Sequence, residues 1–427
     1  MSYRIAGIDV HKKMLAVVVA DVAAEGEYDF ERRQFGSSPD QLRLLTEWLV
    51  EQNIQEVVME STAQYWRPVW QTLEQHWKPE CQSWEGAGPM SGMLHLAQAQ
   101  SNRGPRGRKK DFADAERLLK RLVAQELILS FVPDAEQRLW RTVVRRKYQL
   151  TCDRVRLQNQ LESLLEEAHV KLSSLVSDLL GASARRMLKA LADGETDPAA
   201  LAALADRRLR ATQQQLCDAL GASKELNQVY RRLVKMALDE LQLIEQQMDQ
   251  LDHEIADLLS QHQAAVQRLA EVPGLGVDSA HQIIAEVGAA AGAAAATFPS
   301  EKHLASWVGV CPGEEESAGV SASNRSPKGN RFMRRLLNQA ANAAVKVKGS
   351  IFEIVFRRLL PRLGYQQAIW AIAHRLCRLI WKILHQGVRY DERGPAVSQK
   401  SRGARTAKMI RELRGLGYQV ELSVNPA

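Results

Sequence analysis

An apolar repeat over residues 230–258 constrains the fold more than any other feature of the sequence. Its apolar side chains recur at alternating steps of four and three residues, as the a and d positions of a heptad do. The repeat consists of Tyr230, Val234, Ala237, Leu241, Ile244, Met248, Leu251, Ile255 and Leu258. A long α-helix has this periodicity, and a second helix must cover its apolar stripe. The repeat therefore predicts the seam of a coiled coil.

A charged helical stretch over residues 138–167 offers a partner within the chain. Its apolar seam is looser and consists of Val143, Leu150, Leu157, Leu161 and Leu164. The simplest arrangement is a long antiparallel hairpin, capped by alanine-rich helices around residues 183–220. The seam can also close against a second subunit, so a plain helical spacer and an oligomerisation element both stay open.

The first sixty residues have a different pattern, in which short β-favouring runs surround one helix. Three such runs predict strands at residues 3–10, 14–20 and 30–35. A Pro-Asp pair after Ser38 begins a helix, and a short buried strand at residues 57–59 ends in Glu60. Three strands, a helix and a returning strand match the opening of the ribonuclease-H-like fold.

Four carboxylates stand at or near the ends of these predicted elements. Asp9 lies in the apolar first strand, Glu60 ends the later strand, and Asp111 and Asp114 share one face of a helix that follows Lys110. A carboxylate in an apolar strand is costly to desolvate unless it is paired or bound to a cation. Together the acids predict an Mg²⁺ site, with one or two ions, suited to phosphoryl transfer. The structural alternatives are a turn residue at Asp9, an N-cap at Asp111 and a helix-start residue at Asp114.

Positive charge concentrates in three runs, at residues 103–110, 325–335 and 393–414. The net charge of +7 is modest, so the distribution of charge matters more than its sum. Basic runs favour a polyanionic partner such as nucleic acid, although solvated surface is the alternative for any single run.

Other sequence features exclude function classes. The five cysteines form no C-x-x-C pair and no histidine pair has H-x-x-x-H spacing, which argues against a structural zinc site and a disulfide framework. We see no signal peptide and no run of roughly 18 apolar residues that would span a bilayer. We therefore expect a cytoplasmic, nucleoid-associated protein without a membrane partner.

A Pro-Gly-Leu-Gly turn at residues 273–276 joins two apolar helical stretches. Gly274 and Gly276 permit a tight turn and let backbone amides approach a phosphate beside a helix N-terminus. The turn resembles a helix-hairpin-helix element, and an ordinary helix–helix turn is the alternative.

Ser317 lies between an acidic triplet and small residues, just before the second basic run. A serine hydroxyl can attack phosphorus where the backbone is open, as Gly319 allows, and where cations stabilise the developing charge. Ser321, Ser323 and Ser326 compete for this role. The predicted nucleic-acid contacts are Lys110, Gly274, Gly276, Arg325, Lys328, Asn330, Arg331, Arg334 and Arg335.

Five short motifs occur in one order along the chain. They are Gly7-Ile8-Asp9-Val10-His11-Lys12, Met59-Glu60-Ser61-Thr62, Lys110-Asp111 with Asp114-Ala115, Val272-Pro273-Gly274, and Cys311-Pro312-Gly313 through Glu316-Ser317-Ala318-Gly319 with Lys328-Gly329-Asn330. This series resembles the transposases of the insertion-sequence-110 family, the DEDD-plus-serine recombinases, from about residue 4 to 390. Two positions depart from the family pattern: Lys110 stands where threonine is frequent, and Val320 where a basic residue is common.

The resemblance implies a RuvC-like, Holliday-junction-resolvase-like N-terminal domain whose DEDD set corresponds to Asp9, Glu60, Asp111 and Asp114. It also implies a nucleophilic Ser317 that forms a covalent phosphoserine link to DNA, with the carboxylates of a neighbouring subunit completing the site. The implied partners are element and target DNA, a structured guide RNA encoded by the element, and further copies of the chain in a dimer or tetramer.

The chain of 427 residues, 45% of them hydrophobic, is large enough for two or three domains with cores of their own. We expect an α/β plus α fold: a ribonuclease-H-like DEDD domain at residues 1–130, a helical coiled-coil region at 131–265, a mostly helical serine transposase domain at 266–390 and a basic tail at 391–427. Two rival functions are a metal-dependent junction nuclease with water as the nucleophile and a non-enzymatic, basic architectural protein.

Overall fold

The computed structural model describes residues 3–22, 28–60, 63–77, 94–99, 110–288, 298–311, 315–317, 320–323 and 326–392, with short pieces between 406 and 420. The chain divides into two compact units, Met1–Ala135 and Glu136–Ala427. The predicted basic tail lies largely outside the described residues. Among the residues described, no helix is both long and apolar enough to cross a membrane.

The N-terminal unit is built on a five-stranded mixed sheet in the order β3-β2-β1-β4-β5. Its strands are β1 (Arg4–Val10), β2 (Met14–Asp21), β3 (Glu31–Gly36), β4 (Ile54–Glu60) and β5 (Leu94–Ala97). Strands β1, β2 and β3 pair antiparallel, whereas β4 runs parallel to both β1 and β5. The predicted strands in the first sixty residues are therefore confirmed, and β5 is an addition that the sequence analysis did not contain.

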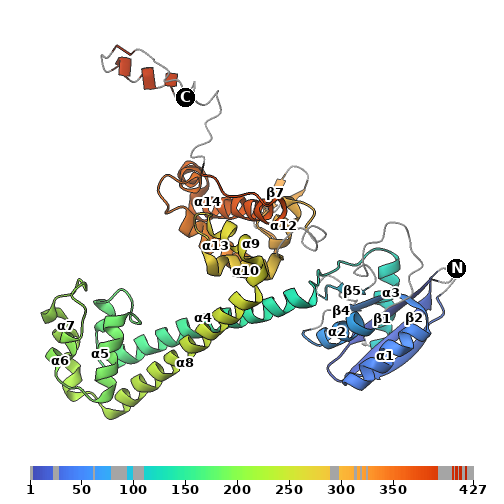
Figure 1. Ribbon diagram of the computed structural model, residues 1–427, viewed down its shortest axis with the longest axis horizontal. Coiled ribbons are helices and arrows are strands. Elements are labelled where there is room, and N and C mark those ends of the chain that lie inside the picture. Colours follow the sequence, from blue (N-terminus) through green and yellow to red (C-terminus); the bar gives the residue numbers. More distant parts are fainter. Residues whose placement is uncertain are drawn as a thin grey trace. The chain divides into compact units, whose positions relative to one another are not determined.

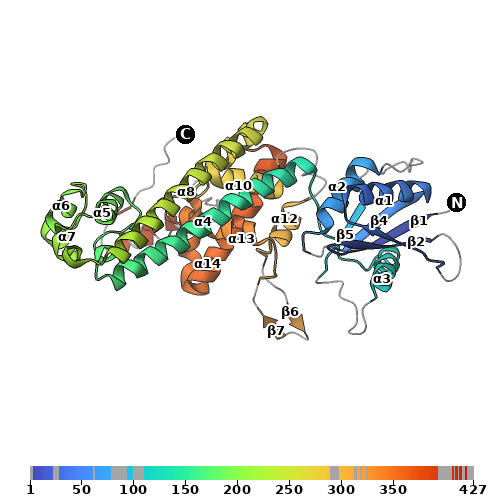
Figure 2. The same ribbon diagram turned by 90° about the horizontal axis from the view of Figure 1, so that it is seen from below.

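Three helices cover the two faces of this sheet. They are α1 (Pro39–Glu51), α2 (Trp66–His76) and α3 (Asp111–Val123). Figure 2 shows α1 and α2 on one face and α3 on the other. The apolar residues follow the two-residue period of a strand: Ala6 and Ile8 pack with α1 and α2, whereas Ile5 packs with Leu119 of α3.

The second unit contains the predicted helical hairpin, formed by α4 (Ala135–Glu167) and α8 (Gln228–Leu258). The two helices lie side by side in both views (Figures 1 and 2). Lys147 pairs with Asp252, and Arg154 pairs with Glu245 at 3.1 Å, so the helices run antiparallel. Residues of the predicted seams, Leu150, Leu157 and Leu161 on α4 and Val234, Leu241 and Ile244 on α8, share one buried cluster. These residues of the stripe are therefore buried within the chain, whereas Tyr230, Ala237, Met248 and Leu251 are partly buried.

Short helices cap the closed end of the hairpin, as the sequence analysis expects. They are η1 (Leu172–Ser174), α5 (Ala182–Asp193), α6 (Pro198–Ala203), α7 (Gln213–Ala219) and η2 (Gly221–Glu225). Arg231 of α8 is buried here and donates to the backbone carbonyls of Leu191, Glu195 and Ser223. This buried guanidinium fixes the cap to the start of α8, because each of its hydrogen bonds would be costly to lose in a dry interior.

The open end of the hairpin is continuous with a helical core. Its elements are η3 (Ser260–His262), α9 (Gln263–Ala270), α10 (Val277–Val287), α12 (Glu301–Val308), α13 (Arg331–Ala344) and α14 (Ile351–Gln386), with a small hairpin of β6 (Glu315–Ser317) and β7 (Val320–Ser323). Trp140 and Val144 of α4 belong to the same buried cluster as these helices. Helix α14 is interrupted at Gly364, whose φ of 72° is not helical. The prediction of a mostly helical C-terminal part is confirmed.

Candidate active site

The acidic residues of the N-terminal unit are brought to one face of the sheet by strand alternation. Ile5 packs against α3, so Gly7 and Asp9, at the next odd positions of β1, face α3 as well. On β4, Val58 packs with Leu118 of α3, which places Glu60 on that same face. Because β1 and β4 are parallel and paired through Ile8 and Met59, the ends of the two strands lie next to each other.

Gly7 brings helix α3 unusually close to the sheet. A Cβ at this position would collide with the carbonyl oxygen of Ala115 and would lie 3.3 Å from the Cβ of Leu119. The absence of a side chain thus lets α3 approach β1 closely at Ala115 and Leu119. This approach puts Asp111 and Asp114 beside Asp9.

Asp9, His11 and Asp111 form the centre of the site. The Nε2 of His11 lies 3.2 Å from Oδ2 of Asp9 and 3.2 Å from Oδ1 of Asp111. One ligand atom from each of these three residues lies within 4.8 Å of the other two. Asp9 is 8% exposed, whereas His11 and the Asp111 side chain reach solvent. The site therefore has a buried carboxylate with two more accessible donors in front of it.

Burial raises the pKa of Asp9 above its ordinary value of 3.8. His11 lowers that pKa in part, while the nearby charges of Asp114 and Asp111 raise it again. Like charges converging on a desolvated carboxylate are costly in the absence of a cation. The charges and the oxygen donors thus fit a divalent metal ion.

Both acids lie in the first turn of α3, so Asp114 is a helix-start residue as its structural alternative holds, whereas Asp111 is not the N-cap. The N-cap position is Lys110, which is exposed, and Asp111 is the first helical residue. Asp114 forms an ion pair with Arg117 one turn further along. Asp111 is therefore not the N-cap, and its carboxylate is directed to His11.

His11 is the member of this site that the sequence analysis did not single out. It follows β1 directly, and its amide donates to the carbonyl of Met14 at 3.0 Å in the turn to β2. The signal that was available is its spacing, since a residue two positions after Asp9 lies on the same side of an extended chain.

In the second unit, Ser317 is the last residue of β6. Its register partner is Val320 of β7, so Ser317 flanks the connection between the two strands. Ser321 and Ser323, the competing serines of β7, are paired with Glu316 and Glu315. Arg325 and Gly319 lie outside the described residues.

The predicted nucleic-acid contacts of residues 326–335 fall into two groups. Lys328 and Arg331 are exposed, and the Arg331 guanidinium lies over the ring of Phe332 at 4.8 Å. Asn330, Arg334 and Arg335 instead have partners within the unit. The side chain of Asn330 accepts from the amides of Phe332 and Met333, and so caps α13.

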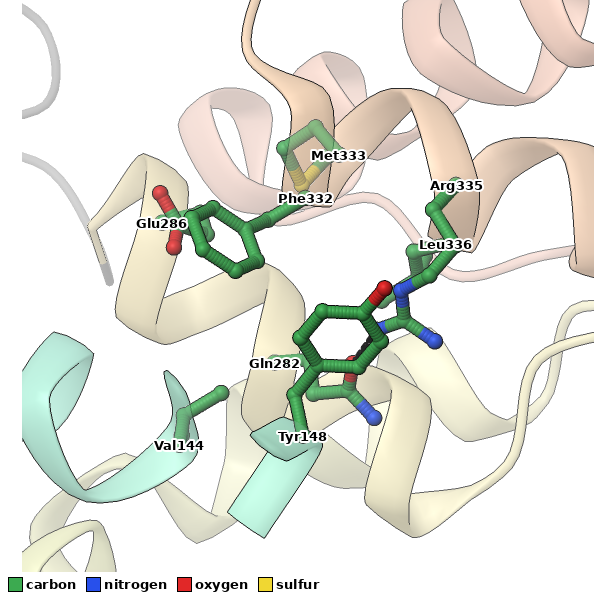
Figure 3. A pocket seen from close by; sticks show the side chains of 8 residues that line it. All are labelled: Val144, Tyr148, Gln282, Glu286, Phe332, Met333, Arg335 and Leu336. Carbon is green, nitrogen blue, oxygen red and sulfur yellow. Dashed lines mark hydrogen bonds between the residues drawn. The ribbon is translucent and has the colours of Figure 1, made fainter. Parts of the chain in front are cut away.

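Arg335 closes a small pocket between α4, α10 and α13. Its guanidinium lies over the ring of Tyr148 at 4.2 Å and donates to Gln282 (Figure 3). It also donates to Gln339 at 2.9 Å. Behind it, Glu286 is 2% exposed and is held by Arg145 through two hydrogen bonds of 2.8 Å. The Arg335 side chain therefore helps to join three helices.

The turn at residues 273–276 links α9 to α10. Gly274 has a φ of 86°, and a Cβ there would lie 2.7 Å from the amide nitrogen of Ala344 on α13. Helix packing thus accounts for Gly274, whereas a side chain at Gly276 would meet open space. The predicted phosphate contact of this turn stays a prediction.

Two family models match this chain, one across the unit with the acidic site and one in the helical unit. A family model for DEDD-type transposases matches residues 6–170, and a model described as the transposase IS116/IS110/IS902 family matches residues 266–354. The chain belongs to the IS110 family of transposases.

Curated relatives agree with this assignment. The chain is 28% identical over 193 residues to a probable family 20 transposase of Pseudomonas aeruginosa, a match that covers 44% of this chain and 55% of that protein. It is 25% identical over 263 residues to an uncharacterized protein of insertion element IS110 from Streptomyces coelicolor, over 58% of this chain and 63% of that protein. A pilin gene-inverting protein of Moraxella bovis is 27% identical over 154 residues, 34% of this chain and 45% of that protein. The chain thus matches less than two thirds of the length of each.

Proposed function

We propose that this chain cuts and exchanges DNA strands, with Ser317 as the nucleophile and with Mg²⁺ held by the acidic residues of the N-terminal unit. The convergence of Asp9, His11 and Asp111 on the α3 face of the sheet carries this proposal. The strand order β3-β2-β1-β4-β5, with three antiparallel strands followed by two parallel ones, supports a ribonuclease-H-like unit.

The chain's own residues prepare this acidic site for a cation. Asp9 provides a buried oxygen donor, Asp111 and Asp114 provide donors on α3, and Glu60 adds a fourth at the end of β4. These are hard oxygen ligands of the kind that Mg²⁺ prefers. When bound, one or two ions would offset the developing charge on a phosphodiester. His11 would orient the carboxylates of Asp9 and Asp111 through its contact with both.

The proposed covalent step is a transesterification. A bond forms between Oγ of Ser317 and the phosphorus while one phosphorus–oxygen bond of the DNA backbone breaks. The serine gives up its proton, and the released sugar oxygen takes up a proton through solvent. Because the phosphodiester energy is kept in the phosphoserine bond, the reverse attack by another strand's hydroxyl completes an exchange.

The proposed partners are inferred from exposed positive charge and from the relatives of the chain. Lys328 and Arg331 are exposed cations in the unit that carries Ser317, and phosphate contacts by such residues drive nucleic-acid binding. The Moraxella bovis relative is named for inverting a pilin gene, which is an outcome of strand exchange. A structured guide RNA, a dimer or tetramer, the four-part domain division and nucleoid association belong to the proposal as well.

A search for a covalent adduct tests the proposed function. The chain would be co-expressed with its element ends, supplied with Mg²⁺ and denatured, and labelled DNA that migrates with the protein would be measured. We expect Ser317→Ala to reduce adduct yield by about 10³-fold or more, because a nucleophile cannot be replaced by its neighbours.

Ser323→Ala is the matched control, since Ser323 lies on the adjacent strand of the same hairpin. Equal adduct from Ser317→Ala and the wild type would reject Ser317 as the nucleophile. DNA that is cut without any retained label would favour the rival junction nuclease, in which water attacks.

A further inference from the structure

The segment that carries Ser317 leaves and re-enters the helical core at two glycines. Gly309 ends α12 with a φ of 75°, and Gly329 precedes the N-cap of α13. A Cβ on Gly309 would lie 2.6 Å from the carbonyl oxygen of Pro327 and 3.0 Å from the amide nitrogen of Gly329. A Cβ on Gly329 would collide with the carbonyl of Val308. The two ends of the segment therefore touch backbone to backbone.

One side chain joins these two ends. The guanidinium of Arg334 donates to the carbonyl of Gly309 on the outgoing end. On the returning end it donates to the carbonyl of Pro327 at 2.9 Å and to Oγ of Ser326 at 3.0 Å. A planar guanidinium with several fixed N–H donors can hold three acceptors at once, which an ammonium group cannot do with the same geometry.

Arg334 is itself held in place from the other side. Its guanidinium lies over the ring of Trp370 on α14 at 4.6 Å, a cation–π contact. The start of α13 is fixed by Asn330, whose side-chain amide donates to the buried Glu286 at 2.9 Å. Arg334 thus ties the two ends of the segment that carries Ser317 to the packed helical core.

We infer that Arg334 is a positioning residue for Ser317: it closes the base of the serine-bearing segment, and it does not contact phosphate. The expected effect of Arg334 on strand cutting rests on the proposed function of Ser317. The contacts that close the base of the segment do not depend on that function. The inference assigns contact with nucleic acid to the exposed neighbours Lys328 and Arg331 and not to Arg334.

The test compares Arg334→Lys with the wild type in the full chain. Lysine keeps the positive charge and the aliphatic part of the side chain but lacks the planar guanidinium group with its several N–H donors. The fold should therefore be retained, while the contacts at the base of the segment are loosened. We expect the single-turnover rate of adduct formation to fall by about 10- to 100-fold, as misplacement of a reacting group by about an ångström does. Affinity for the element ends, measured at several salt concentrations, is expected to stay within about twofold with an unchanged salt slope.

A readout independent of chemistry is limited trypsin digestion after Lys328, which is exposed. Loosening of the base is expected to accelerate this cut in Arg334→Lys. The matched control is Arg357→Lys on α14, an exposed arginine paired only one turn away with Glu353. Its adduct rate and its digestion rate should equal those of the wild type.

Each outcome separates the inference from the proposed function. A wild-type rate of adduct formation in Arg334→Lys overturns the positioning role. The role is also overturned if Arg334→Lys loses enough DNA affinity, with a lower salt slope, to account for its entire loss of rate. If wild-type protein forms no adduct, the proposed function fails, and the digestion rate alone then decides whether Arg334 closes the base. Unaltered digestion after Lys328 in that case overturns the closure as well.

Discussion

The acidic site and the β6–β7 hairpin differ in how their proposed reactive groups are held in place. The acids stand on β1, β4 and α3, where strand alternation and a glycine contact direct them to the same side of the sheet. Ser317 stands on the β6–β7 hairpin, in a segment whose two ends meet at Gly309 and Gly329 and are joined by Arg334.

This difference shows that two regions of one chain can position their side chains by different kinds of structure. A metal site needs several donors at fixed separations, so it benefits from the rigidity of a packed sheet and helix. A nucleophile that must reach a large polymer needs a fixed origin but an open approach, and loops held by a rigid scaffold supply this. The comparison predicts that damage to the two regions has separate consequences, which the following variants examine.

The largest effect on stability is expected for Glu286→Gln in the second unit. Glu286 is buried and is held by Arg145 and Asn330, so neutralising it removes a charge partner in a dry interior. Breaking such a buried pair costs about 3 kcal/mol of unfolding free energy. Chemical denaturation measures the loss, and Mg²⁺ affinity of the N-terminal unit should be unchanged. A parallel loss of Mg²⁺ binding would break the separation of the two regions.

An intermediate effect is expected for Gly7→Ala in the N-terminal unit. The new methyl group would collide with the backbone of α3 at Ala115 and force the helix away from β1. Overpacking of this kind costs about 1–3 kcal/mol. Because Asp111 moves with α3, Mg²⁺ binding measured by calorimetry should weaken as well.

Gly36→Ala is the control for this variant, since a Cβ there meets the flexible side chain of Gln41 at 3.0 Å and no backbone. Equal Mg²⁺ affinity in Gly7→Ala and the wild type would contradict the role given to the close approach of α3.

The smallest effect, and one of opposite sign, is expected for Asp9→Asn in the metal-free protein. Burial and the neighbouring acids raise the pKa of Asp9, so the folded state binds its proton more tightly than the unfolded state does. The free energy of unfolding of the wild type should therefore rise as pH falls from neutral through the raised pKa of Asp9 towards its ordinary value of 3.8. At higher pH the destabilisation by ionised Asp9 should be complete.

Asparagine cannot ionise, so Asp9→Asn should be more stable than the wild type at neutral pH by about 1 kcal/mol, as removal of a strained functional charge commonly gives. Thermal unfolding with and without Mg²⁺ measures this, and added Mg²⁺ should stabilise the wild type more than the variant. A variant that is less stable than the wild type at neutral pH without metal would show that Asp9 is a structural residue.

The sequence by itself determined the features that depend on local order along the chain. The short β-favouring runs of β1 and β4, the two acids at the start of α3 and the heptad of α8 are readable because each depends on residue type and spacing within one element. These patterns sufficed to predict the first four strands, the helices α1 and α3, the antiparallel hairpin and the gathering of Asp9 with Asp111. Asp111 could be read as an N-cap only until the start of α3 was known.

The tertiary structure decided what spacing cannot specify. Strand β5 spans only the four residues Leu94–Ala97 and pairs with β4, so its formation depends on the sheet that it completes. Arg334 and Arg335 read as members of a basic run, yet their guanidinium groups are engaged by Gly309, Gln282 and Tyr148, which lie 25 to 187 residues earlier in the chain. The sequence shows that Arg334 and Arg335 are charged, but their partners are defined only when distant segments fold beside them.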